Sequence, residues 1–188
     1  MNKIDYDKLF EAEKEKKRGA KLLLHCCCAP CATSVIERLY KDFSVTLYYY
    51  NPNIMPKEEY DLRAENLKKL ADIHSLELIV EEYKPEEFLR FANDMKDAPE
   101  GGARCQKCIA LRLDATKNYA EQNGFDLFTS TLTVSPHKNA QMINEYGESI
   151  DKERWLHSDF KKKNGFLRST ELSKQYGIYR QNYCGCKL

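Results

Sequence analysis

The sequence predicts an α/β protein with one domain, in which helices flank a mostly parallel sheet. Short apolar runs alternate with segments of helical period along most of the chain. A length of 188 residues is enough to bury a substantial core in one domain. The first apolar run, Leu22–Leu24, ends abruptly in a group of cysteines. In α/β sheets, ligand-binding groups follow the strands at this position.

The strands are predicted from apolar, β-branched and aromatic runs. The clearest are 21–26, which is rich in leucine, and 44–50, which ends in three tyrosines. Two further runs lie at 76–80 and 126–130, and a weaker run at 154–157 is compatible with a fifth strand. Because helical segments separate these runs, parallel pairing is expected.

The helices are predicted from apolar periodicity, capping signals and charge pairs. The expected helical segments are 33–42, a long one from Pro56, 88–91, 109–122, 139–146 and 168–176. Residues 1–19 are rich in Lys and Glu with opposite charges at helical spacing, so they predict a solvated N-terminal helix. The domain itself is expected over 20–188, because no repeat, linker or low-complexity segment interrupts it.

Composition limits the possible partners. The chain has 30 Lys and Arg against 29 Asp and Glu, a net charge of +1. A nucleic-acid surface would therefore have to be a local patch. No run is long and apolar enough to cross a bilayer, and the first residues lack the apolar core of a signal peptide. We expect a cytoplasmic protein without a membrane partner.

Eight cysteines need an explanation, because reducing compartments do not normally support a disulfide framework. They lie at 26, 27, 28 and 31, at 105 and 108, and at 184 and 186. Inert core thiols would be scattered, so the clustering favours either a structural zinc site or a redox or iron–sulfur site.

The pair Cys105-x-x-Cys108 precedes a helix, whose dipole and free amides would stabilise thiolates. With two cysteines from the first group it would supply the four ligands of a zinc ion or a [4Fe–4S] cluster. Cys26, Cys27 and Cys28 cannot all reach one small ion, because side chains alternate along extended backbone. Cys184-Gly185-Cys186 would close a strained, easily reduced disulfide or supply two more metal ligands; both alternatives remain open.

Several polar residues are candidates for the same edge of the sheet. His137 and the pair Tyr50-Asn51 follow predicted strands, whereas His25 is expected to be a satisfied structural histidine. The basic run 161–163, with Arg168 and Arg180, is compatible with contacts to a nucleic-acid backbone. No glycine-rich phosphate loop follows the first strand, so use of ATP or NAD is not expected.

A set of motifs resembles the QueH family of epoxyqueuosine reductases over about residues 20 to 186. The motifs are His25-Cys26-Cys27-Cys28-Ala29-Pro30-Cys31, Tyr50-Asn51-Pro52-Asn53-Ile54, Glu59-Tyr60 with Arg63, Arg104-Cys105-Gln106-Lys107-Cys108, Thr131-Leu132-Thr133-Val134-Ser135-Pro136-His137-Lys138, Asp159-Phe160-Lys161-Lys162 and Tyr179-Arg180-Gln181-Asn182-Tyr183-Cys184-Gly185-Cys186. As a set they are highly specific.

The resemblance implies the last step of queuosine synthesis, in which the epoxide of epoxyqueuosine at the wobble position of tRNA is reduced to the alkene. It implies a Rossmann-like fold of the HUP or PP-loop type, without cobalamin. It also implies a [4Fe–4S] cluster on Cys27, Cys28, Cys105 and Cys108, and a redox-active pair at Cys184 and Cys186. An additional mononuclear iron would take Cys31 as a ligand, and Cys26 would be a spare thiol.

The other roles follow from the same resemblance. Tyr183, His137 and Asp159 are the candidate acid–base residues, and substrate contacts are expected at Tyr50, Asn51, Arg63, Lys138, Lys161 and Arg180. The expected partners are tRNA carrying epoxyqueuosine and a one-electron donor such as ferredoxin or flavodoxin. Two other classes stay open: an iron–sulfur tRNA thiolation enzyme and a zinc-stabilised RNA-binding module.

Overall fold

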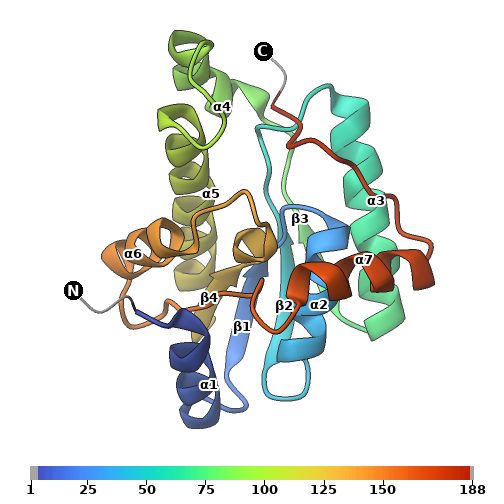
Figure 1. Ribbon diagram of the computed structural model, residues 1–188, viewed down its shortest axis with the longest axis vertical. Helices are drawn as coiled ribbons and strands as arrows, with labels where there is room; N and C mark the ends of the chain where they lie inside the picture. The colour runs from blue at the N-terminus through green and yellow to red at the C-terminus, as the bar shows by residue number, and fades with distance from the viewer. Residues whose placement is uncertain (1–3, 187–188) are drawn as a thin grey trace.

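The computed structural model describes residues 4–186, and its centre is a four-stranded sheet in the order β3-β2-β1-β4 (Figure 1). The strands are β1 (Lys21–His25), β2 (Ser44–Tyr49), β3 (Glu77–Val80) and β4 (Leu127–Ser130). All three pairings are parallel. The predicted α/β fold with a parallel sheet flanked by helices is confirmed.

Strand register brings the functional loops to one edge of the sheet. His25 at the end of β1 pairs with Tyr48 of β2 on one side and with Ser130 of β4 on the other. The chain segments that follow these three strands therefore leave the sheet at the same level. They contain the first cysteine group, Tyr50-Asn51 and the 3-10 helix η2 (Thr131–Val134).

Two hydrophobic layers cover the sheet. Leu22 and Leu24 of β1 pack into one cluster with α2 and α3, and Leu23 between them packs into the other with α5 and α6. This alternation is what a strand buried on both faces requires. The helices are α1 (Tyr6–Lys16), α2 (Ala29–Leu39), α3 (Lys57–His74), α4 (Pro85–Ala92), α5 (Ala103–Gln122), α6 (Ala140–Ile150) and α7 (Gly165–Gln175), with the 3-10 helix η1 (Asn93–Met95) after α4.

Four helices, α2, α4, α5 and α7, begin earlier than their sequence patterns predict, and two of these carry cysteines. Helix α2 begins at Ala29 and carries Pro30 in its first turn, where the missing amide hydrogen costs no hydrogen bond. Helix α5 begins at Ala103. As a result Cys31, Cys105 and Cys108 lie in the first two turns of helices, close to their positive ends.

The predicted fifth strand at 154–157 is wrong. The segment lies beside β4, but it forms only an isolated bridge between Phe128 and Trp155. The Trp155 amide bonds to the carbonyl of Asp151 in a turn, and its fully buried ring packs edge-on against Phe128 at 5.2 Å. Packing of this one large ring takes the place of a continuous ladder.

The N-terminal helix α1 is solvated on one face only. Its charged face is as predicted, but Tyr6 and Phe10, one turn apart, are buried. The Phe10 ring lies 5.4 Å from that of Phe160, and Arg38 of α2 forms ion pairs with Asp7 and Glu11. Two apolar residues at this spacing are enough to seat a short helix on a core. Among the described residues, no helix is both long and apolar enough to cross a membrane.

Candidate thiol and metal centre

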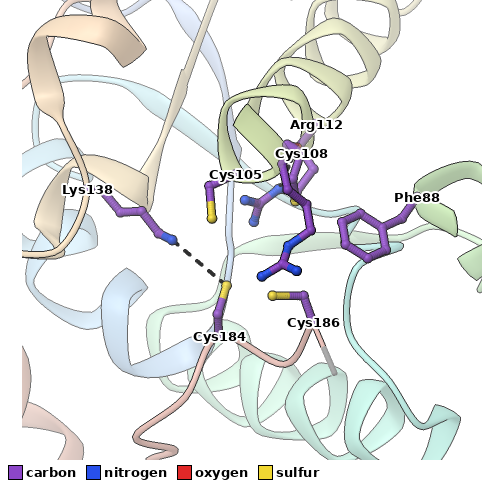
Figure 2. A pocket seen from close by; sticks show the side chains of 8 residues that line it. Phe88, Cys105, Cys108, Arg112, Lys138, Cys184 and Cys186 are labelled. Atoms are coloured by element: carbon purple, nitrogen blue, oxygen red, sulfur yellow. Dashed lines mark hydrogen bonds between the residues drawn. The ribbon is translucent and has the colours of Figure 1, made fainter. Parts of the chain in front are cut away.

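Seven of the eight cysteines lie around the carboxyl edge of the sheet, and they come from three segments. Cys27, Cys28 and Cys31 lie where β1 passes into α2. Cys105 and Cys108 lie in the first two turns of α5, and the C-terminal tail supplies Cys184 and Cys186 (Figure 2). None of the eight forms a disulfide in this structure.

The first group is a thiol triad. The Sγ atoms of Cys27, Cys28 and Cys31 all lie within 4.8 Å of one another, so they could hold a metal ion. Hydrogen bonds from Cys28 and Cys31 hold the pKa of Cys27 well below its usual value, against the effect of burial. The Thr131 hydroxyl adds a further hydrogen bond to Cys27 Sγ at 3.3 Å. The triad thus favours at least one thiolate, the form that binds metals.

Cys26 faces the other way. Its side chain is fully buried in the core under α2, and its thiol donates to the Leu24 carbonyl at 3.4 Å. Burial raises the pKa of the Cys26 thiol. The alternation of side chains along extended backbone therefore separates Cys26 from Cys27, as predicted.

The second group lines a small cavity between α5 and the tail, in which thiols and cations face one another (Figure 2). Cys105, Cys184 and Cys186 point toward a shared space, and Lys138 reaches it from the loop before α6. The lining residues are Phe88, Arg104, Cys105, Cys108, Arg112, Lys138, Cys184 and Cys186.

Neighbouring groups acidify the thiol of Cys184 in this cavity. A hydrogen bond from Cys186, together with the charges of Lys138 and Arg112, lowers the pKa of Cys184 to about 5, although burial opposes the shift. Lys138 Nζ lies 3.9 Å from Cys184 Sγ. Gly185 between the two cysteines has φ +104°, a conformation that favours glycine, and a side chain there would approach the Arg63 guanidinium at 3.3 Å. The glycine lets the two thiols turn to the same side.

The buried guanidinium of Arg112 connects the two thiol groups. Its Nε donates to the Cys108 carbonyl at 3.2 Å, and its Nη1 donates to Asn51 Oδ1 at 3.3 Å. Asn51 in turn donates to the Cys26 carbonyl at 2.9 Å. Asn51, a predicted substrate contact, is thus engaged within the protein.

A model of the family described as epoxyqueuosine reductase QueH matches residues 22–188. The epoxyqueuosine reductase QueH of Streptococcus pyogenes serotype M1 is 41% identical over an alignment of 198 positions, which covers 98% of this chain and 77% of the relative. Its counterpart in Thermotoga maritima is 37% identical over an alignment of 171 positions, which covers 88% of each chain. This chain belongs to the QueH family of epoxyqueuosine reductases. The predicted family is confirmed, and with it the class of enzyme, an oxidoreductase.

The QueH motif residue Arg63 lies beneath the tail. Its Nη1 donates to the Cys184 carbonyl at 2.9 Å, Nη2 to the Tyr183 carbonyl at 3.4 Å, and Nε pairs with Glu59 at 2.7 Å. The Tyr183 ring also covers the guanidinium, with Arg63 Cζ 5.1 Å from the centre of the ring. In this position Arg63 fixes the path of the tail across α3 (Figure 1).

Two more motif segments of the QueH family lead to the cavity by direct contacts. Asp159 pairs with Lys161 at 3.2 Å, Lys161 donates to the Lys138 carbonyl at 3.3 Å, and Lys138 reaches Cys184. His137, one residue away, is exposed. Asp159 is thus linked to the cavity through Lys161 and the backbone of Lys138.

The remaining predicted residues lie at the margins. The Tyr50 hydroxyl donates to Glu87, and burial with this bond raises its pKa. Arg180 is exposed and lies over the Phe166 ring at 5.1 Å. His25 is a structural residue, as predicted: its ring nitrogens contact Ser130 Oγ at 2.8 Å and the Tyr50 carbonyl at 3.1 Å, and burial lowers its pKa to about 4.

Sequence reasoning missed Arg112, Phe88 and Thr131 as parts of the centre. Arg112 had a readable signal, because it follows Cys108 by four residues and so shares its face of α5. Phe88 had none, since its approach depends on how α4 packs against α5.

Proposed function

We propose that this chain reduces epoxyqueuosine in tRNA to queuosine at an iron–sulfur centre built from its clustered thiols. The observation that carries the proposal is the gathering of seven thiols from three segments at one edge of the sheet. Family membership supplies the reaction, and the thiols supply the chemistry that a two-electron reduction needs.

The donor set suits an iron–sulfur cluster. Every candidate ligand is a sulfur, and thiolates are the ligands that such clusters use. We assign Cys27, Cys28, Cys105 and Cys108 to a [4Fe–4S] cluster, and the proximity of Cys31 to Cys27 and Cys28 supports its assignment to an additional iron. When bound, such a centre supplies single electrons and a Lewis acid for the epoxide oxygen.

The C-terminal tail would supply the electrons and protons of the reaction. Conversion of the epoxide to the alkene takes two electrons and two protons and releases the oxygen as water. Oxidation of the Cys184 and Cys186 thiols to a disulfide releases the same number of both. A one-electron donor such as ferredoxin or flavodoxin would restore the dithiol in two steps. The low pKa of Cys184 supports this role, because thiolates are the reactive form.

Asp159 would act by positioning rather than by passing protons. Its carboxylate is mostly buried and pairs with Lys161, whose ammonium donates to the Lys138 backbone carbonyl, and this contact holds the loop from which the Lys138 ammonium lies beside Cys184. A general acid must lie within reach of the leaving oxygen. We therefore favour Tyr183, which directly precedes Cys184 in the tail, over the exposed His137.

The tRNA would approach over the tail and the loop before α7. Lys161 and Arg180 can neutralise backbone phosphates there, and the exposed Phe166 and Tyr183 rings offer stacking surfaces. The wobble base would have to leave the anticodon stack to reach the cavity, as modified bases generally do when an enzyme acts on them.

The test is the visible spectrum and the iron and zinc content of protein purified without oxygen, followed by an assay of epoxyqueuosine reduction in tRNA. We expect a brown protein with several irons per chain and product formation that depends on a reductant. A colourless protein with about one zinc per chain and no reductase activity would contradict the proposal and indicate a zinc-stabilised RNA-binding module.

A further inference from the structure

Arg112 is buried, and among residues 4–186 no Asp or Glu forms an ion pair with it. The residue is only 2% exposed. Its two hydrogen-bond acceptors, the Cys108 carbonyl and Asn51 Oδ1, are neutral groups. A buried charge is costly unless an opposite charge compensates it. The compensating charge must therefore come from something else at this site.

Two other enclosed arginines are compensated by carboxylates of the protein. Arg38 pairs with Asp7 and Glu11, and Arg63, which is 3% exposed, pairs with Glu59. Arg112 instead lines the thiol cavity beside Cys105, Cys108, Cys184 and Cys186, whose sulfur atoms can carry negative charge as thiolates.

We propose that Arg112 is the built-in counter-charge of the thiol centre, a positioning residue that stabilises the negative charge of the thiolates and of the metal centre they hold. This inference rests on the proposed function, because it concerns the same thiols. An iron–sulfur cluster together with its four thiolate ligands has a net negative charge. A fixed guanidinium in a site of low dielectric constant would stabilise that charge strongly.

The guanidinium is well placed to stay fixed. Nε bonds one turn back along α5, and Nη1 bonds to Asn51, whose amide is itself anchored on the Cys26 carbonyl. The other two cations of the cavity are held less firmly. Arg104 donates to two backbone carbonyls at the end of the 3-10 helix η1, those of the half-buried Met95 and the exposed Lys96, and Lys138 is half-buried. Water screens their charges more than that of Arg112.

A consequence for electron transfer follows. Each electron that enters the centre adds negative charge, so a nearby positive charge favours the reduced state and raises the reduction potential. Removal of the charge at Arg112 should lower the equilibrium constant for one-electron reduction about tenfold, which corresponds to about 59 mV. Arg112→Lys keeps the charge and should retain most of the potential.

The experiment compares wild type, Arg112→Met, Arg112→Lys and the control Arg38→Met, an arginine whose partners are carboxylates far from the thiols in sequence. Redox titration of the iron-loaded proteins gives the midpoint potential. Thermal unfolding with and without zinc, which binds thiolates but transfers no electrons, gives the stabilisation by metal. We expect Arg112→Met to lower both the potential and the zinc-dependent gain in Tm, while Arg112→Lys and Arg38→Met change neither.

A structural role would look different. If Arg112 only bridges Asn51 and α5, Arg112→Met lowers Tm equally with and without zinc and leaves the potential unchanged, which overturns the inference. Equal shifts in Arg112→Lys and Arg112→Met also overturn it, because charge would not be the cause. Failure of the proposed function appears separately, as a wild type without iron, and the zinc comparison still decides the role of Arg112. A wild type that binds neither metal overturns both.

Discussion

The junction of α1 with α2 encloses Arg38 together with its carboxylate counter-ions, whereas Arg112 in the thiol cavity forms no ion pair with an Asp or Glu among residues 4–186. Arg38 lies 2.7 Å from Asp7 and 2.8 Å from Glu11, and its guanidinium packs 4.7 Å from the centre of the Phe10 ring. Arg112 is more deeply buried and lines the thiol cavity beside Cys105, Cys108, Cys184 and Cys186 instead. At the junction, carboxylates of the protein balance the positive charge of Arg38. At the cavity, we infer that the positive charge of Arg112 is balanced only when the thiols are deprotonated.

The difference separates a region that balances its charges within the protein from a region that leaves a charge for a ligand. A scaffold satisfies its charges internally, because stability is all that is required of it. A site that must bind metal and accept electrons leaves charge available for its ligand, and perturbed ionisable groups gather there. Changes in the two regions should therefore have different readouts, namely chemistry at the thiols and stability at the junction.

The largest effect is expected for Cys105→Ala. Loss of a cluster ligand should abolish the iron–sulfur absorption and reduce turnover by more than about 100-fold, since even outer-shell changes at metal sites cost about 10–100-fold. Iron analysis and the tRNA assay measure the two effects. Cys26→Ala is the matched control, because Cys26 faces the core and should leave iron content and turnover close to wild type. Full activity in Cys105→Ala would remove Cys105 from the centre.

Cys186→Ser separates the ligands from the redox pair. If Cys184 and Cys186 exchange electrons rather than bind the cluster, the variant should keep its iron and its colour but lose repeated turnover. The reason is that one thiol cannot form the intramolecular disulfide. Quantification of product per enzyme under reducing conditions, beside iron content, tests this. Loss of iron in Cys186→Ser would instead make the tail a source of metal ligands.

Most of the fold could be predicted because its signals are local. The run of Leu22 to Leu24, the tyrosine-rich β2 and the alternation with helices all specify a buried parallel sheet. The failures have physical reasons of another kind. The segment around Trp155 resembles a strand, but its conformation is decided by a ring that packs against Phe128, and α1 resembles a solvated helix because two apolar residues are a weak signal.

The clustering of the cysteines is visible in the sequence, but their grouping in space is not. Spacing cannot show that Cys31 lies against Cys27 and Cys28 while the tail joins Cys105 and Cys108, and the cluster ligands Cys27, Cys28, Cys105 and Cys108 stay a prediction. That grouping depends on the meeting of three segments separated by more than 70 residues. The spacing of Arg112 from Cys108 places it on the same helix face, but that no Asp or Glu among residues 4–186 pairs with it is a property of the packed structure that no spacing shows.

Phe10→Ala tests the scaffold side of the comparison. The Phe10 side chain is fully buried between Phe160 and Arg38, so its truncation should lower the free energy of unfolding by about 3–5 kcal/mol. Denaturant unfolding measures the loss. Ile4→Ala is the matched control, since Ile4 is 59% exposed at the same end of the chain and should change stability by less than about 0.5 kcal/mol. A negligible loss for Phe10→Ala would mean that α1 is not seated on the core in solution.

The smallest effect is expected for Glu11→Gln, through its dependence on pH. Burial alone would raise the pKa of Glu11, but hydrogen bonds from Lys14, Lys163 and Arg38 lower it from 4.5 to about 2. A carboxylate with a depressed pKa stabilises the folded state fully above pH 4.5 and loses that contribution as the pH falls toward 2. The difference in stability between wild type and Glu11→Gln should therefore shrink over this interval, as measured by denaturant unfolding at several pH values. A difference independent of pH would show that the ion pairs of Glu11 do not form in solution. Iron content should not change in this variant, because the charges that Glu11 balances belong to the junction and not to the thiols.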